Sequence, residues 1–249
     1  MEENSIHYSF ASLGTIVNNV LAEQETTHPD AEYRIDAGAA MGTPLNMPAN
    51  SANLRRWFHR EVYDKNLGKS LQVLWDAARP QFVDANGAMK PVPRWDGIRT
   101  GVPLGEASDA FVADDELLRA ARSIREIDEG ITRRQYGYDS VDDYYAAASS
   151  DQRLGEIRAP LLLMNAYDDP IVPGRSLLRA IEAARANPQI VFALTSHGGH
   201  LGWCDRDDAA FGPWRGPEWV ERAALGFLET ALDIEPASEC DQPACILFD

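Results

Sequence analysis

Three short segments of this chain carry side chains that could together cleave an ester. They are residues 10–14 (Phe-Ala-Ser-Leu-Gly), 168–170 (Asp-Asp-Pro) and 197–200 (His-Gly-Gly-His). A serine hydroxyl becomes an effective nucleophile when a histidine takes its proton, and the histidine needs a carboxylate to fix its tautomer and stabilise its cation. Each segment lies at the end of an apolar run that is typical of a strand. We therefore expect the three side chains to meet where the strands of one sheet end.

The elements that must position these segments alternate between strands and helices. Continuous apolar runs separated by helical patterns indicate parallel strands that are buried on both faces. The sequence thus predicts an α/β fold with a parallel sheet flanked by helices. We expect strands at residues 6–11, 33–41, 160–166 and 190–195, and helices at 13–24, at 176–186 and from about 217.

The middle of the chain has a different pattern. From about residue 50 to 150, helical periodicity is broken by Pro and Gly clusters such as those at 90–93 and 100–103, which mark turns. We expect a mostly helical insertion or lid there, within a single incomplete domain over residues 1–232. Residues 233–249 are acidic and contain Pro, and we expect them to form a loosely ordered tail.

Each candidate residue has a simpler explanation when it is taken alone. Ser12 could cap the helix that follows it, and Asp168 and Asp169 could form a solvated turn. Those aspartates with His197 and His200 could instead hold a metal ion, although the Gly-Gly between the histidines argues against a helix that presents both on one face. Phe10 also stands where a nucleophile turn requires a small residue. The serine hypothesis is favoured because all three candidates lie at the ends of predicted strands and follow one another in the order Ser, Asp, His.

Composition argues against several classes of protein. The chain has 249 residues with 23 basic and 39 acidic side chains, and its net charge of −16 repels nucleic acid and anionic lipid headgroups. The three cysteines, Cys204, Cys240 and Cys245, are too few and too clustered near the C-terminus to indicate a disulfide framework, and no Cys-x-x-Cys pair indicates a zinc site. No apolar run approaches the ~18 to 20 residues of a membrane span, and the N-terminus lacks the basic start of a secretory signal. As given, the chain is expected to be soluble and cytoplasmic, with no cofactor.

A family resemblance is carried by motifs between Arg125 and Trp203. The order Ser, Asp, His is that of the α/β-hydrolases, and the chain resembles the branch of that superfamily that contains the YheT-type hydrolases (AB hydrolase family 4). The motifs are Ile-Asp-Glu at 127–129, Thr-Arg-Arg at 132–134, Tyr-Gly-Tyr at 136–138, Asp-Asp-Tyr-Tyr at 142–145, the stretches 157–160 and 165–170, and His-Gly-Gly-His-Leu-Gly-Trp at 197–203. A weaker match runs through 11–14 and 44–71.

The resemblance implies a catalytic triad. It makes Ser12 the nucleophile, Asp169 the acid and His200 the base, with the amide of Leu13 as half of an oxyanion hole. The resemblance favours Asp169 over Asp168 because the family's acid directly precedes the Pro. It favours His200 over His197 because the second histidine of the segment is the family's catalytic one. His197 is then expected to brace the loop. The implied activity is that of a carboxylesterase or lipase that acts on small-molecule or lipid esters through an acyl-enzyme.

The front of the chain departs from the resemblance. Members carry several strands before the nucleophile, whereas eleven residues precede Ser12 here, so the chain is expected to be the C-terminal part of a hydrolase that is truncated at its N-terminus. A membrane anchor, common near the N-terminus of eukaryotic members, would make the whole protein membrane-associated. Three functions remain open: a serine esterase, a catalytically inactive truncated or scaffold protein with this fold, and a metal-dependent hydrolase.

Overall fold

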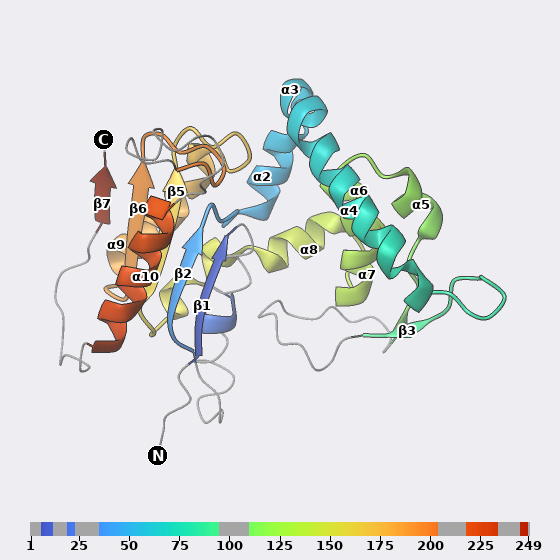
Figure 1. Cartoon of the computed structure of the whole chain (residues 1–249), viewed down its shortest axis with the longest axis horizontal. Coiled ribbons are helices and arrows are strands. Elements are labelled where there is room, and N and C mark those ends of the chain that lie inside the picture. The colour runs from blue at the N-terminus through green and yellow to red at the C-terminus, as the bar shows by residue number, and fades with distance from the viewer. Residues whose placement is uncertain are drawn as a thin grey trace, which may run out of the picture. The chain divides into compact units, whose positions relative to one another are not determined.

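The chain divides into two compact units in a computed structural model (Figure 1). The sheet unit comprises Met1–Asn46 and Ser149–Asp249, and the helical unit is Met47–Ala148. The structure describes residues 6–11, 19–22, 35–94, 110–203, 218–233 and 245–248. From the sequence, a helical insertion is expected over about residues 50–150.

The sheet unit contains a sheet of five parallel strands in the order β1-β2-β5-β6-β7. The predicted α/β fold with a parallel sheet is therefore confirmed. All six residues of β5 are buried, as the continuous apolar run predicted. The strands are β1 (Ile6–Ala11), β2 (Ile35–Met41), β5 (Leu161–Ala166), β6 (Ile190–Thr195) and β7 (Cys245–Phe248).

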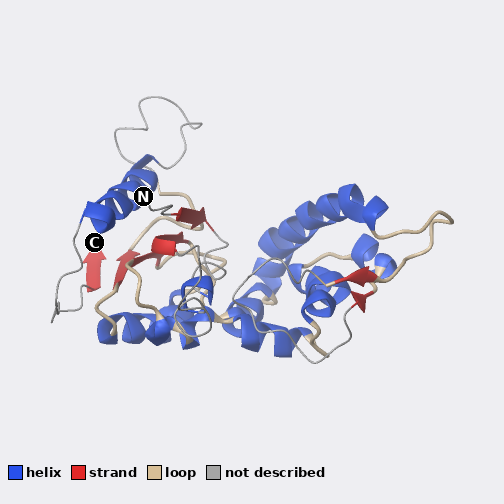
Figure 2. Ribbon diagram, turned by 90° about the horizontal axis from the view of Figure 1, so that it is seen from below, coloured by secondary structure: helices blue, strands red, loops and turns tan. Residues whose placement is uncertain are grey.

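Both faces of this sheet are covered, and Figure 2 shows helices on either side of the strands. Side chains alternate across a strand, so Leu161 and Leu163 enter one core with Ala180 and Ala184 of α9 (Leu178–Ala186). The other core has Leu162 and Met164 packed against α10 (Glu218–Asp233), whose contacts recur every four residues at Val220, Ala224 and Leu228. Short 3₁₀ turns complete the connections: η4 (Ser150–Gln152), η5 (Leu154–Glu156) and η6 (Gly174–Leu177). Helical residues 19–22 add Leu21 and Ala22 to the first core.

The helical unit is a chain of short helices around its own core, which centres on Trp75, Phe82, Phe111, Leu118 and Ile127. Two of its turns, η1 and η3, are π-helical. Its helices are α2 (Met47–Leu54), α3 (Trp57–His59), η1 (Arg60–Asp64), α4 (Lys65–Ala78), η2 (Arg79–Gln81), α5 (Asp115–Ala120), α6 (Ile124–Ile127), η3 (Asp128–Thr132), α7 (Arg133–Tyr136) and α8 (Val141–Ala148).

Two short features differ from the sequence-based expectation. An antiparallel pair, β3 (Val92–Pro93) with β4 (Ala110–Phe111), lies in the segment that was expected to be mostly helical. Strand β7 lies in the segment for which a loosely ordered tail was expected, and it pairs in parallel with β6. The residues of β7 are Cys-Ile-Leu-Phe, an apolar run whose β propensity was masked by the acidic composition around it.

None of the described helices is long and apolar enough to cross a membrane.

Candidate active site

Asp169 occupies the turn that follows β5. Its Oδ1 accepts hydrogen bonds from the backbone N–H groups of Ile171 (2.7 Å) and Val172 (3.0 Å), as aspartate does in tight turns. The side chain is fully buried. These two bonds fix the carboxylate orientation and leave Oδ2 for a different partner.

That partner is His200, which follows β6. Its Nδ1 lies 2.9 Å from Asp169 Oδ2, and 17% of the histidine side chain is exposed. When Nδ1 carries the proton, the carboxylate holds this tautomer and Nε2 is left as a proton acceptor. The structure thus brings together the two residues that the family resemblance named as acid and base, 31 positions apart in the chain.

Asp168 and His197 are adjacent to these residues or in the same loop, but they contact other groups. Asp168 Oδ1 accepts the backbone N–H of Gly199 at 2.8 Å, which ties the loop after β5 to the loop after β6. His197 is exposed and its Nδ1 lies 3.0 Å from Ser196 Oγ. In the described part of the chain, no three His, Cys, Asp or Glu side chains cluster as metal ligands would.

The glycines of the histidine loop permit its close packing. A Cβ on Gly198 would lie 2.3 Å from Trp203 Nε1, and that indole N–H donates to Thr195 Oγ1 at 2.8 Å. Gly199 has φ +55°, and Leu201 has φ +65°, a value that is rare for a residue with a side chain. The turn is closed by the Gly202 N–H, which donates to the Gly198 carbonyl at 2.8 Å.

The residues after β2 that support this loop were not predicted from the sequence. Gly42 follows β2 with φ +58°, and a Cβ there would lie 2.7 Å from Leu201 Cδ2 and 3.6 Å from His200 Cε1. Beside it, the buried Asn165 donates from Nδ2 to the Thr43 carbonyl at 3.3 Å. The Gly-Thr-Pro at 42–44, directly after the strand predicted at 33–41, was the sequence signal for a turn at this position.

Ser12 and Leu13 lie outside the described residues. Strand β1 ends at Ala11, which pairs with Met41 of β2, and Met41 immediately precedes Gly42. The described strands therefore bring the ends of β1, β2, β5 and β6 to one edge of the sheet, since all four run in parallel.

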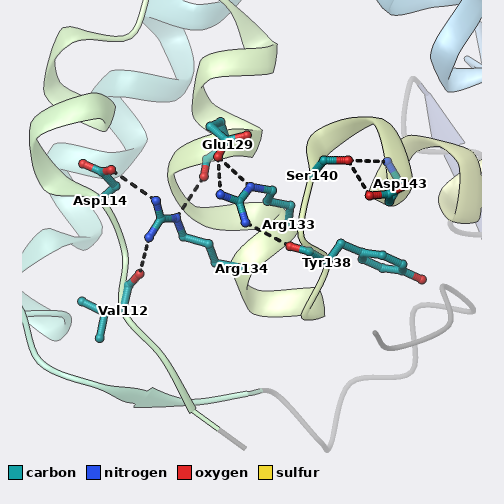
Figure 3. Close-up of polar contacts among 8 residues, drawn as sticks. All are labelled: Val112, Asp114, Glu129, Arg133, Arg134, Tyr138, Ser140 and Asp143. Carbon is teal, nitrogen blue, oxygen red and sulfur yellow. Dashed lines mark hydrogen bonds and ion pairs between the residues drawn. The ribbon is translucent and has the colours of Figure 1, made fainter. Parts of the chain in front are cut away.

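The motif residues between 125 and 145 contact one another within the helical unit and are not part of the Asp169–His200 pair. Arg133 contacts Glu129 and donates to the Tyr138 carbonyl at 3.0 Å (Figure 3). Arg134 joins the Glu129 carbonyl (3.1 Å) to Asp114 Oδ2 (3.2 Å). Further contacts are Ser140 with Asp143, the forked pair of Arg125 with Asp142, and Tyr145 with Asp128.

A parallel sheet flanked by helices, with an acid and a histidine at the ends of successive strands, is the arrangement of an α/β-hydrolase. The chain belongs to the α/β-hydrolase superfamily. No protein-family model matches it.

The proteins that this chain is similar to include a phospholipase and an esterase. The chain is 43% identical over 116 residues to embryogenesis-associated protein EMB8 of Picea glauca (45% of this chain, 25% of the relative), and 34% identical over 121 residues to phospholipase ABHD3 of Homo sapiens (48% and 28%). It is 27% identical over 216 residues to medium-chain fatty acid ethyl ester synthase/esterase 2 of Saccharomyces cerevisiae (86% and 43%). The chain thus spans less than half the length of each. Among solved structures, Candida antarctica lipase A aligns with 98% of this chain and 52% of its own at 13% identity and a TM-score of 0.44.

Proposed function

We propose that this chain carries the triad of a serine hydrolase that cleaves carboxylic esters, with Ser12 as nucleophile, His200 as base and Asp169 as the residue that positions the base. The observation that carries the proposal is the 2.9 Å contact between His200 Nδ1 and a fully buried Asp169 carboxylate. A buried carboxylate with one oxygen fixed by two backbone amides is suited to hold an imidazole in one tautomer.

The chemistry proceeds in two half-reactions. His200 Nε2 takes the Ser12 hydroxyl proton while Ser12 Oγ bonds to the ester carbonyl carbon, and the Leu13 amide stabilises the oxyanion. The alkoxide then leaves with the proton from His200, which gives an acyl-enzyme on Ser12. A water molecule loses its proton to Nε2 and attacks the acyl carbon, and this step releases the carboxylic acid and restores the serine.

The proposed substrates are acyl esters, lipid esters among them. The support is the names of relatives: phospholipase ABHD3 of Homo sapiens, and monoacylglycerol lipase ABHD2 of Danio rerio, which is 35% identical over 133 residues (52% of this chain, 29% of the relative).

Ester turnover in paired histidine variants tests the proposal. We expect hydrolysis of a short-chain nitrophenyl ester by this chain, with kcat reduced by about 10⁴-fold or more in His200→Ala. His197→Ala is the matched control, because it removes an imidazole from the same loop, and the Nδ1 of that imidazole contacts Ser196. The kcat of this variant should stay near that of the wild type. Equal losses in the two variants would remove His200 from its role.

One observation favours a second function, a catalytically inactive chain that keeps the fold. Phe10 stands two residues before Ser12, where the nucleophile turn has little room for a large side chain. Saturable ester turnover that depends on His200 would exclude this alternative. A folded chain with no turnover would support it.

A further inference from the structure

A continuous helical run from Trp57 to Ala78, formed by α3, η1 and α4, exposes large apolar side chains. Trp57 is 74% exposed and Leu74 is 64% exposed, and Phe58, Val62 and Val73 are also exposed. The other side of the run is buried, at Asp64, Gly68 and Trp75. Exposed apolar side chains that gather on one element mark an interaction surface.

A cationic pocket lies beside this run. Its volume is about 610 Å³, and α4 lines it with Lys65, Asn66, Lys69 and Gln72. The facing wall is residues 119–122, which contribute Arg119 and Arg122. The lining therefore has four cations, two amide side chains and no acid, so it matches an anion.

Gly68 brings the two walls of the pocket together. A Cβ at this position would lie 2.6 Å from the backbone nitrogen of Ser123, so only glycine lets α4 approach the 122–123 backbone this closely. Gln72 Nε2 also donates to the Arg119 carbonyl across the pocket. Lys65 pairs with Glu61 at 3.3 Å. Neither Lys69 nor Arg122 has an ion-pair partner among the residues that the structure describes.

Local charge here is opposite in sign to that of the whole chain. Residues 55–78 contain five basic and three acidic side chains, a local charge of 5 − 3 = +2, whereas the net charge of the chain is −16. One of the three acids, Asp64, is buried and accepts the Ile124 N–H at 2.9 Å. Because exposed charges more than about 8 Å away are largely screened at physiological salt, the local charge affects what approaches the run more than the net charge of the chain does.

We propose that this face of the helical unit docks on an anionic phospholipid surface, with a phosphate-bearing headgroup in the pocket between α4 and residues 119–122. Trp57 and Phe58, beside Arg55 and Arg56, then lie at the level of the headgroups. Basic side chains interleaved with Trp, Phe and aliphatic residues on one helical face are typical of helices that lie in a membrane interface. A soluble phosphate ester would use the pocket but would leave the apolar side chains exposed.

Vesicle co-sedimentation with the whole chain tests this surface. We expect binding to phosphatidylcholine vesicles that contain about one-third phosphatidylglycerol, weak binding to phosphatidylcholine alone, and loss of binding as salt rises. Lys69→Gln with Arg122→Gln should weaken binding about 30-fold, since each charge near the surface contributes about fivefold. Lys90→Gln with Arg185→Gln, which removes the same charge from exposed positions outside the pocket, should bind within about twofold of the wild type.

Two further variants separate the possible occupants. Trp57→Ser with Phe58→Ser should weaken vesicle binding and leave binding of inorganic phosphate, followed by calorimetry, unchanged. His200→Ala should bind vesicles as the wild type does, so a failure of the proposed hydrolysis does not affect this test. The proposal is overturned if the chain binds both vesicle types equally, if it binds inorganic phosphate but no vesicle, or if the two charge-removing double variants behave alike.

Discussion

The two oxygens of the Asp169 carboxylate have separate tasks. Oδ1 holds the turn after β5 through two backbone amides, and Oδ2 contacts His200. The orientation of the histidine therefore depends on the turn as well as on the acid itself. The neighbouring carboxylate, Asp168, fixes the histidine loop from a different point, at Gly199.

Gly198 gives a test of the loop at the scale of one residue. Gly198→Ala should destabilise the protein by about 1–3 kcal/mol, because the added methyl group would overlap the Trp203 indole. Thermal unfolding measures the change. Gly155→Ala is the control, since a Cβ there would have no atom within 4 Å beyond its chain neighbours. An equal loss of stability in the control would contradict the overlap with Trp203.

The convergence of the Asp-Asp-Pro and His-Gly-Gly-His segments at one sheet edge could be predicted from the strand pattern, because both segments follow recognisable strands. The choice of Asp169 and His200 within them came from the family resemblance, and the residues that support the pair were not predicted. The approach of Gly42 to Leu201 joins residues that are far apart in the chain. Such a contact depends on how the strands are ordered in the sheet, which hydrophobic periodicity does not reveal.

At the scale of elements, the same substitution should have opposite effects in two helices. Gly68→Ala in α4 should cost about 1–3 kcal/mol of stability, because the methyl group would meet the Arg122–Ser123 backbone. Gly226→Ala in α10 should add about 0.5–1 kcal/mol, because that position is open and alanine favours a helix. Chemical denaturation measures both, and changes of the same sign would contradict the packing described for α4.

The π-helix η3 contains a carboxylate whose ionisation opposes folding. Burial raises the pKa of Asp128, whose Oδ2 accepts a hydrogen bond from the Tyr145 hydroxyl at 2.6 Å. The folded-state pKa therefore lies above the unfolded value of about 4, and the stability of the protein should fall as the pH rises through this interval.

Asp128→Asn should remove this part of the pH dependence, since an amide oxygen can still accept from Tyr145 and does not ionise. We expect the melting temperature of the variant, relative to the wild type, to be higher at pH 7.5 than at pH 4. Asp84→Asn is a control at an exposed turn. A relative melting temperature that does not change with pH would contradict the role of burial.

For the whole molecule, the sequence predicted β1, β2, β5, β6, α9 and α10 in their order along the chain, because each has a clear hydrophobic pattern. Most of the helix expected at 13–24 lies outside the described residues. The sequence did not predict β7 or the β3–β4 pair, which have four and two residues per strand, too few for a periodic signal. The cationic pocket was also missed, because its walls are about fifty residues apart and the overall charge is acidic.

We propose that the Asp169–His200 pair activates Ser12. Labelling of the whole chain with a fluorophosphonate probe, followed by peptide mapping, tests this most directly. We expect one adduct, on the peptide that contains Ser12, with labelling abolished in Ser12→Ala and retained in Ser70→Ala, a serine that is exposed on α4. An adduct at another position, or undiminished labelling of Ser12→Ala, would show that the pair does not serve this nucleophile.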